Sequence, residues 1–211
     1  MGNVLIKFSE AFKEHKIFYM LVLLFFCIGV VIGVYTVVYM NEVDRNDVTS
    51  YFSTFVSSVC EKKISYGNLL LSVLKKSLLL IIPIVLISFT FLGSPIILII
   101  DLIKGFLIGY TFAFIFNSFE GKGLLMAVVS IIPQNLFYIP CIIILSVLGL
   151  NVSLGIVKNK IQKNQNNYRL EFIREKGSVY FFTLCFLIMG ILFETYISPS
   201  IIRLVVTKFY I

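Results

Sequence analysis

The sequence predicts an all-α fold, a polytopic membrane bundle of about five transmembrane helices with short amphipathic helices at the membrane surface. Apolar residues make up 59% of the 211 positions, charged residues only 14%, and the mean hydropathy is +0.98. An ordinary soluble domain is less apolar and more charged. The uncharged stretches are long enough to cross a bilayer as helices, whereas a β-barrel would show alternating segments of about ten residues.

Charge and residue types exclude several classes of function. The chain has 18 Lys and Arg against 11 Asp and Glu. Many of the basic residues gather in one stretch between two apolar runs, as the positive-inside rule describes, so we expect no nucleic-acid binding. A single histidine leaves no imidazole cluster for zinc, and no nucleophile elbow or phosphate-binding glycine loop occurs. We therefore expect no catalytic site, no cofactor and no bound metal.

The first predicted elements are an interfacial helix and a membrane span. Residues 1–16 carry apolar side chains at helical spacing among lysines, which predicts a cytoplasmic interfacial helix. The uncharged run from Ile17 to Met40 is too long for the core of a signal peptide and predicts the first transmembrane helix. Within this run, Gly29 and Gly33 form a GxxxG spacing, which suits close helix packing.

Residues 41–76 predict an extracytoplasmic segment, the largest on its side of the membrane. Five aromatic and aliphatic residues recur there at helical spacing: Tyr51, Phe52, Phe55, Val56 and Val59. The pattern favours a helix that lies on the membrane surface. The alternative is that the same residues form a docking face for an extracytoplasmic partner.

The second and third spans are predicted to form a hairpin. A lysine at the centre of a membrane helix costs about 3 kcal/mol on insertion scales. We therefore expect the second span to begin after Lys75 and Lys76 and to run from Ser77 to Leu92. Ser94 is then the predicted N-cap of the third span, with Pro95 at its first helical position.

The third span carries an ionisable pair and a second glycine motif. Asp101 and Lys104 are three residues apart, a spacing that lets the two side chains neutralise each other on one helix face. Gly105 and Gly109 repeat the GxxxG spacing. The pair is either an internal ion pair that fixes helix register or part of a functional site, and the sequence leaves both interpretations open.

The fourth span, the uncharged run from Gly123 to Val157, contains the most unusual stretch of the chain. Pro133 and Pro140 each remove a backbone donor and predict a broken helix, and the adjacent amides of Gln134 and Asn135 can bond to neighbouring helices. One interpretation is a kinked span whose amides hold helices together. The other is a discontinuous helix that lines a site at mid-membrane, as transporters use.

The remaining elements are a basic segment and a fifth span. Residues 158–176 predict a basic cytoplasmic loop, with six lysines and arginines against two glutamates. The fifth span is predicted from Gly177 to Ile197, with Glu194 near its far end. This arrangement places the N-terminus and the basic loop on the cytoplasmic side.

Four stretches of the sequence carry a resemblance to a known family. They are Leu92-Gly93 with Pro95, Lys104-Gly105-Phe106 with Gly109, the run from Ile132 to Pro140, and the run from Phe193 to Pro199. Together they resemble stage II sporulation protein M, in the same order and over essentially the whole chain. The Pro-Gln-Asn-x-Phe string inside a membrane span is the more specific part of this resemblance, because glycine motifs are common in membrane helices.

The resemblance implies a role in endospore formation, at the mother-cell membrane of the sporulation septum and of the engulfing membrane. It implies a non-enzymatic scaffold in the lipid bilayer that anchors two peptidoglycan-degrading partners, stage II sporulation proteins D and P. The competing class is a transporter or channel component that uses the broken fourth helix together with Asp101 and Lys104. The sequence leaves open whether the chain forms an oligomer.

Overall fold

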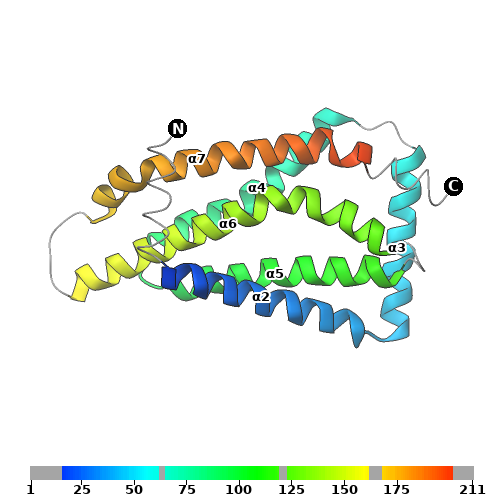
Figure 1. Ribbon diagram of the computed structural model, residues 1–211, viewed down its shortest axis with the longest axis horizontal. Coiled ribbons are helices and arrows are strands. Elements are labelled where there is room, and N and C mark those ends of the chain that lie inside the picture. Colours follow the sequence, from blue (N-terminus) through cyan, green and yellow to red (C-terminus); the bar gives the residue numbers. More distant parts are fainter. Residues whose placement is uncertain (1–15, 62–64, 119–122, 162–167, 202–211) are drawn as a thin grey trace.

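The computed structural model describes residues 16–61, 65–118, 123–161 and 168–201, which form helices joined by short turns (Figure 1). Within these ranges, five helices are long and apolar enough to cross a membrane. They are α2 (Lys16–Val38), α4 (Tyr66–Ser88), α5 (Gly93–Ser118), α6 (Gly123–Ile161) and α7 (Tyr168–Tyr196), and the remaining described helix is α3 (Glu42–Glu61). The same ranges contain no strand, so the predicted all-α membrane bundle is confirmed.

Helix α6 is the centre of the bundle. It packs against each of the other four apolar helices, and a larger share of its apolar span is buried than of theirs. Its 39 residues have a contour length of about 58 Å, almost twice the roughly 30 Å of a bilayer's hydrocarbon core. The helix is therefore long enough to cross the membrane and to carry Lys158 and Lys160, in its last turn, outside the hydrocarbon.

Of the two interpretations of the fourth span, the structure agrees with a kinked helix, and the predicted break is wrong, because α6 continues through both Pro133 and Pro140. Figure 1 shows a helix that bends part-way along its length. Each proline removes one backbone hydrogen bond and crowds the preceding turn, which is sufficient to kink a helix. Here the four surrounding helices hold the rest of the helical turns in place.

Helices α2 and α5 pack backbone to backbone through the two GxxxG spacings. At each of the four glycines, an added Cβ would collide with a backbone carbonyl of the opposite helix. The four collisions are Gly29 with Leu102, Gly33 with Phe106, Gly105 with Phe26 and Gly109 with Val30. Only residues without a side chain allow this separation, so the two motifs are the two halves of one contact.

The turn between α4 and α5 is held by a side chain of α6. The Ser153 hydroxyl donates a hydrogen bond to the carbonyl of Thr90, at 3.1 Å, and accepts one from the backbone N–H of Ser94, at 2.9 Å. The predicted N-cap at Ser94 is wrong, since α5 already begins at Gly93. A hydroxyl from a neighbouring helix instead satisfies one of the backbone donors that a helix start leaves without an intrahelical partner.

Two further predicted boundaries differ from the structure. Helix α4 begins at Tyr66, so Lys75 and Lys76 lie inside the second apolar helix and not before it. Both lysines are exposed, so the helix can form without burying either ammonium group in the bundle. The predicted basic loop at 158–176 is largely helical, because α6 and α7 extend into it from its two ends. Lys, Arg, Glu and Gln are good helix formers, so a helix need not end where the apolar residues end.

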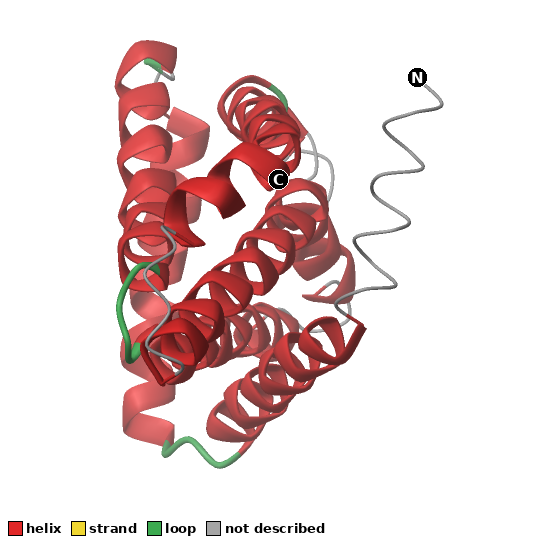
Figure 2. Ribbon diagram, turned by 90° about the vertical axis from the view of Figure 1, so that its left-hand side faces the viewer, coloured by secondary structure: helices red, strands yellow, loops and turns green. Residues whose placement is uncertain are grey.

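Helix α3 lies across one end of the bundle at a steep angle to the other helices (Figure 1), and Figure 2, which looks along the bundle, shows it upright behind them. Val48 packs against an apolar cluster formed at that end by α2, α5 and α6. The Arg45 guanidinium donates a hydrogen bond of 3.3 Å to the carbonyl of Asn117, in the last turn of α5, where a cation also complements the helix dipole. This placement agrees with a helix on the membrane surface.

Two of the predictions concern parts of the chain that the structure leaves undescribed. The interfacial helix expected at residues 1–16 lies outside the described residues apart from Lys16. For the expected partner face, only the helical backbone is described and not the side chains of Tyr51, Phe52, Phe55, Val56 and Val59. Both stay predictions.

Candidate functional site

The two amides of α6 have different surroundings. Asn135 is buried, and its Nδ2 donates a hydrogen bond of 2.8 Å to the carbonyl of Ile131, one turn earlier in the same helix. Gln134 is only half-buried. The described contact of Asn135 is thus a local one, which supports the backbone of α6 on the turn that contains Pro133.

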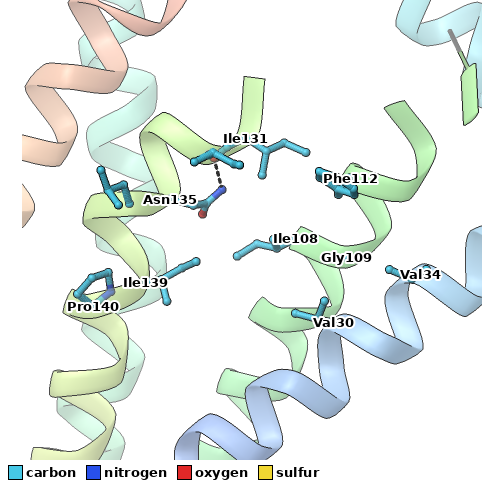
Figure 3. A pocket seen from close by; sticks show the side chains of 11 residues that line it. Val30, Val34, Ile108, Gly109, Phe112, Ile131, Asn135, Ile139 and Pro140 are labelled. Atoms are coloured by element: carbon cyan, nitrogen blue, oxygen red, sulfur yellow. Dashed lines mark hydrogen bonds between the residues drawn. The ribbon is translucent and has the colours of Figure 1, made fainter. Parts of the chain in front are cut away.

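Asn135 also lines a cavity of about 480 Å³ between α6 and the α2–α5 pair (Figure 3). The rest of the wall is apolar and comes from three helices: Val30, Val34, Ile108, Gly109, Phe112, Ile131, Ile132, Leu136, Ile139 and Pro140. The pocket is open on the side where Ile132 and Leu136 are exposed. A bound water needs two to four polar partners. Asn135 is the single polar side chain among these lining residues, so the cavity is suited to hydrocarbon and not to an ion or a polar solute.

The residues that follow Asn135 connect α6 to α7 and α4. Phe137 packs against the rings of Phe186 and Phe193 on α7, with centroids 5.3 Å away in both cases. It also lies against Gly190, where an added Cβ would come within 2.8 Å of the Phe137 Cβ. One turn of α6 thus carries both the Pro-Gln-Asn string and an aromatic contact with α7.

Tyr138 provides the corresponding contact with α4. Its hydroxyl accepts a hydrogen bond of 3.1 Å from the hydroxyl of Ser77, and both side chains are buried. The carboxylate of Glu194, on α7, lies beside the same tyrosine hydroxyl. Side chains from α4, α6 and α7 therefore meet at the Tyr138 hydroxyl.

Asp101 is the most deeply buried ionisable residue of the third span. Its side chain is 1% exposed, and its Oδ1 accepts a hydrogen bond of 2.7 Å from the hydroxyl of Ser146 on α6. Its Oδ2 is buried and has no hydrogen-bond partner among the described residues. Burying a carboxylate with one oxygen lacking a hydrogen bond costs free energy. Asp101 Oδ2 is the buried polar side-chain atom of the described residues whose burial is not compensated in this way.

The predicted pairing of Asp101 with Lys104 does not occur in the described structure. A separation of three residues permits contact on a helix but does not require it. Asp101 is turned toward Ser146, whereas the charged groups near Lys104 are Lys76 and Glu194. In this region an ion pair joins Lys76 Nζ on α4 to Glu194 Oε1 on α7, at 3.8 Å.

The polar contacts that join the helices involve residues that the sequence did not single out. Tyr138, Ser146 and Ser153 lie on α6 at steps of eight and seven residues, which places them within roughly 80° of one another around the helix. A line of hydroxyl groups along a largely apolar helix is a signal that spacing alone could have revealed. In the described ranges, no cluster of three His, Cys, Asp or Glu side chains is placed to hold a metal ion.

One comparison with known proteins identifies the family. A family model described as stage II sporulation protein M matches residues 22–199. No match was found among curated proteins or among solved structures. The matched range includes both glycine motifs, Asp101 and the Pro-Gln-Asn string of α6, and it covers most of α2 and all of the apolar helices that follow. The chain belongs to the stage II sporulation protein M family.

Proposed function

We propose that this protein is a non-enzymatic membrane scaffold of sporulation. It holds two peptidoglycan-degrading partners, stage II sporulation proteins D and P, at the septal and engulfing membrane of the mother cell. Membership of the family supports a sporulation role, and five apolar helices support a multi-pass membrane protein. The two named partners come from the family resemblance of the sequence.

The observation that carries the proposal is how the polar side chains inside the bundle are used. Ser146, Tyr138 and Ser153 of α6 bond to α5, to α4 and to the turn between them. The cavity of about 480 Å³ has apolar walls with a single amide. These groups fix the arrangement of helices, which is what a scaffold needs, because neighbouring helices in a membrane gain little from the hydrophobic effect.

One observation favours a second candidate, a transporter or channel component. The Oδ2 atom of Asp101 is buried without a hydrogen-bond partner, and an ionisable group at such a position can be part of a proton or ion pathway. Asn135, Tyr138 and Ser153 of α6 each bond to protein groups other than Asp101. The scaffold therefore remains the first proposal.

The scaffold has a defined orientation in the proposal. The joined ends of α6 and α7 face the cytoplasm because residues 158–176 are rich in Lys and Arg, and α3, at the other end of the bundle, faces outward. A cysteine introduced by Gln165→Cys should then be protected from an impermeant thiol reagent in intact cells, while Cys60 reacts. Reaction at position 165 with protection of Cys60 contradicts this orientation.

The proposed platform for the partners is α3. It stands across the end of the bundle, and the described side chains of its first turns, among them Val43 and Asp47, are exposed. The experiment follows fluorescent fusions of the two hydrolases in sporulating cells that carry Phe52→Ser with Phe55→Ser. Lys158→Gln with Lys160→Gln, at the opposite end, is the matched control.

The expected result is loss of hydrolase localisation in the α3 variant at normal membrane abundance, with normal localisation in the control. Normal localisation of both hydrolases in cells that lack the protein altogether contradicts the scaffold proposal itself. Normal localisation in the α3 variant alone contradicts only the placement of the platform on α3.

A further inference from the structure

The outer surface of α4 carries two adjacent lysines half-way along a membrane-spanning helix. Lys75 and Lys76 are both exposed, and the side chain of Lys76 is 71% exposed. Lys75 follows Tyr66, the first residue of α4, by nine residues, which is a depth of about 14 Å along the helix. The hydrocarbon core is roughly 30 Å thick, so an α4 that crosses it from Tyr66 places Lys75 near the middle.

Positive charge exceeds negative charge around this point. Lys76 is paired with Glu194, and Lys104 is close to the same two groups. Lys75 makes no ion pair with any described residue. Among the described residues, Lys76 and Lys104 thus have Glu194 as their nearby carboxylate and Lys75 has none, since Asp101 is buried and bonded to Ser146. An ammonium group facing hydrocarbon is unfavourable, and an external carboxylate would remove the imbalance.

The surface around Lys75 has the spacing of a helix-packing stripe. Large apolar residues flank it at steps of three and four: Leu71, Leu78, Leu79, Ile82 and Leu86. All five are exposed, and Leu79 is 78% exposed. On this helix face the ammonium of Lys75 lies among large apolar side chains, and the exposed polar residues Asn68 and Ser72 lie toward the start of the helix. The apolar part of such a face packs well against a second apolar helix.

We infer that this face of α4 docks a transmembrane helix of another protein, one that carries an Asp or Glu near the middle of its span. The apolar stripe provides the packing, and Lys75 provides the charge that selects a carboxylate. The inference rests on the proposed function, because it describes how a scaffold in the membrane recognises a membrane-anchored partner.

Two other occupants fit less well. A second copy of this chain offers no free carboxylate at this depth among its described residues, because Asp101 is 1% exposed and Glu194 already pairs with Lys76. A lipid headgroup lies at the membrane surface, where the stacked rings of Tyr66 and Tyr196 form an aromatic pair typical of the interface. A carboxylate within a membrane helix reaches Lys75 without deforming the bilayer.

The test uses the full-length protein in phosphatidylcholine vesicles with a labelled single-span polyleucine helix as the probe. One probe carries Glu at its centre and the matched probe carries Gln, and binding is measured by energy transfer from a label on the protein. We expect the Glu probe to bind about tenfold more tightly than the Gln probe. Lys75→Met should abolish this preference, and Lys158→Met, near the end of α6, should leave it unchanged.

Lys75 is the residue to change because it forms no ion pair with the described residues, so its replacement does not leave Glu194 alone. Equal binding of the two probes overturns the inference, and so does an undiminished preference in Lys75→Met. If phosphatidylglycerol in the vesicles removes the preference, the lysines bind lipid headgroups and the inference also falls.

The vesicle experiment contains no hydrolases, so its result is independent of the scaffold proposal. A Lys75-dependent preference for Glu together with hydrolases that localise without the protein supports the docking face and contradicts the scaffold. Correct recruitment of hydrolases with no preference for Glu contradicts the docking face alone.

Discussion

The hydroxyl of Ser146 donates a hydrogen bond of 2.7 Å to Oδ1 of Asp101, and this contact joins the central helix α6 to α5 at a depth where both side chains are buried. Oδ2 of the same carboxylate has no hydrogen-bond partner among the described residues. The Ser146 hydroxyl is therefore the described group that compensates Asp101 for its loss of water. Changes at these two residues are expected to depend on each other.

Ser146→Ala should destabilise the bundle, because it leaves Asp101 buried with neither oxygen satisfied. The loss is expected to be about 1.5–3 kcal/mol, the range for a hydrogen bond to a charged group. Ser72→Ala is the control, since Ser72 is exposed and bonds only to the carbonyl of Asn68 in its own helix. The measurement is the thermal midpoint of the detergent-solubilised protein, and equal midpoints for the two variants would contradict the assignment.

Gly105→Ala should weaken the pairing of α2 with α5. The new Cβ would collide with the carbonyl of Phe26, a backbone atom that cannot rotate away, and overpacking of this kind costs about 1–3 kcal/mol. Gly67→Ala is the matched control, because a Cβ there meets nothing within 4 Å. In a helix the control change is neutral or slightly stabilising. A lowered thermal midpoint is expected for Gly105→Ala alone, and a similar effect of both changes argues against a backbone contact.

Ser153→Ala should loosen the turn between α4 and α5. The change removes the acceptor of the part-buried Ser94 N–H, and a buried donor left unsatisfied costs about 1–3 kcal/mol. It also removes a donor to the Thr90 carbonyl, which keeps its hydrogen bond of 3.3 Å from the Gly93 N–H. Ser153→Thr keeps the hydroxyl and should retain more of the stability. Limited proteolysis of the solubilised protein gives the readout, with cleavage between residues 88 and 94 expected to rise only for the alanine variant. Cleavage at equal rates in both variants would contradict the role of the hydroxyl.

The sequence predicts the membrane class and most of the helices because those depend on local composition. The runs around Gly29 and Gly105 are apolar enough to be recognised as spans, and their glycine spacing suits close packing. That the two motifs pack against each other is a relationship between distant parts of the chain. Nothing in either motif specifies its partner, so this contact becomes visible only in the structure.

The predictions that failed are those in which a local rule competes with tertiary packing. Proline was expected to break the fourth span, but neighbouring helices hold α6 continuous through Pro133 and Pro140. Asp101 was expected to pair with Lys104 because helical spacing allows it, but the hydroxyl of Ser146, 45 residues away, is its partner. The spacing of the hydroxyl groups on α6 could be read from the sequence, but which distant residue each of them bonds to could not.

The central claim is that polar groups inside this bundle maintain its shape and do not conduct an ion or a proton. Replacement of Asp101 is the change for which a scaffold and an ion or proton pathway predict the most different results, because Oδ2 of this residue is buried without a hydrogen-bond partner among the described residues. Asp101→Asn removes the charge while the remaining amide oxygen can still accept the Ser146 hydrogen bond. A scaffold needs the shape and the hydrogen bond, whereas a proton or ion pathway needs the carboxylate itself.

The most direct measurement therefore follows Asp101→Asn in sporulating cells by membrane abundance, localisation of the two hydrolases and completion of engulfment. Asp101→Leu, which removes the hydrogen bond as well, is the companion variant and is expected to lower abundance. The scaffold account predicts that Asp101→Asn accumulates, recruits both hydrolases and supports engulfment at the level of the unchanged protein. Normal abundance and normal recruitment with failed engulfment would contradict it and give first place to a pathway that needs the charge of Asp101.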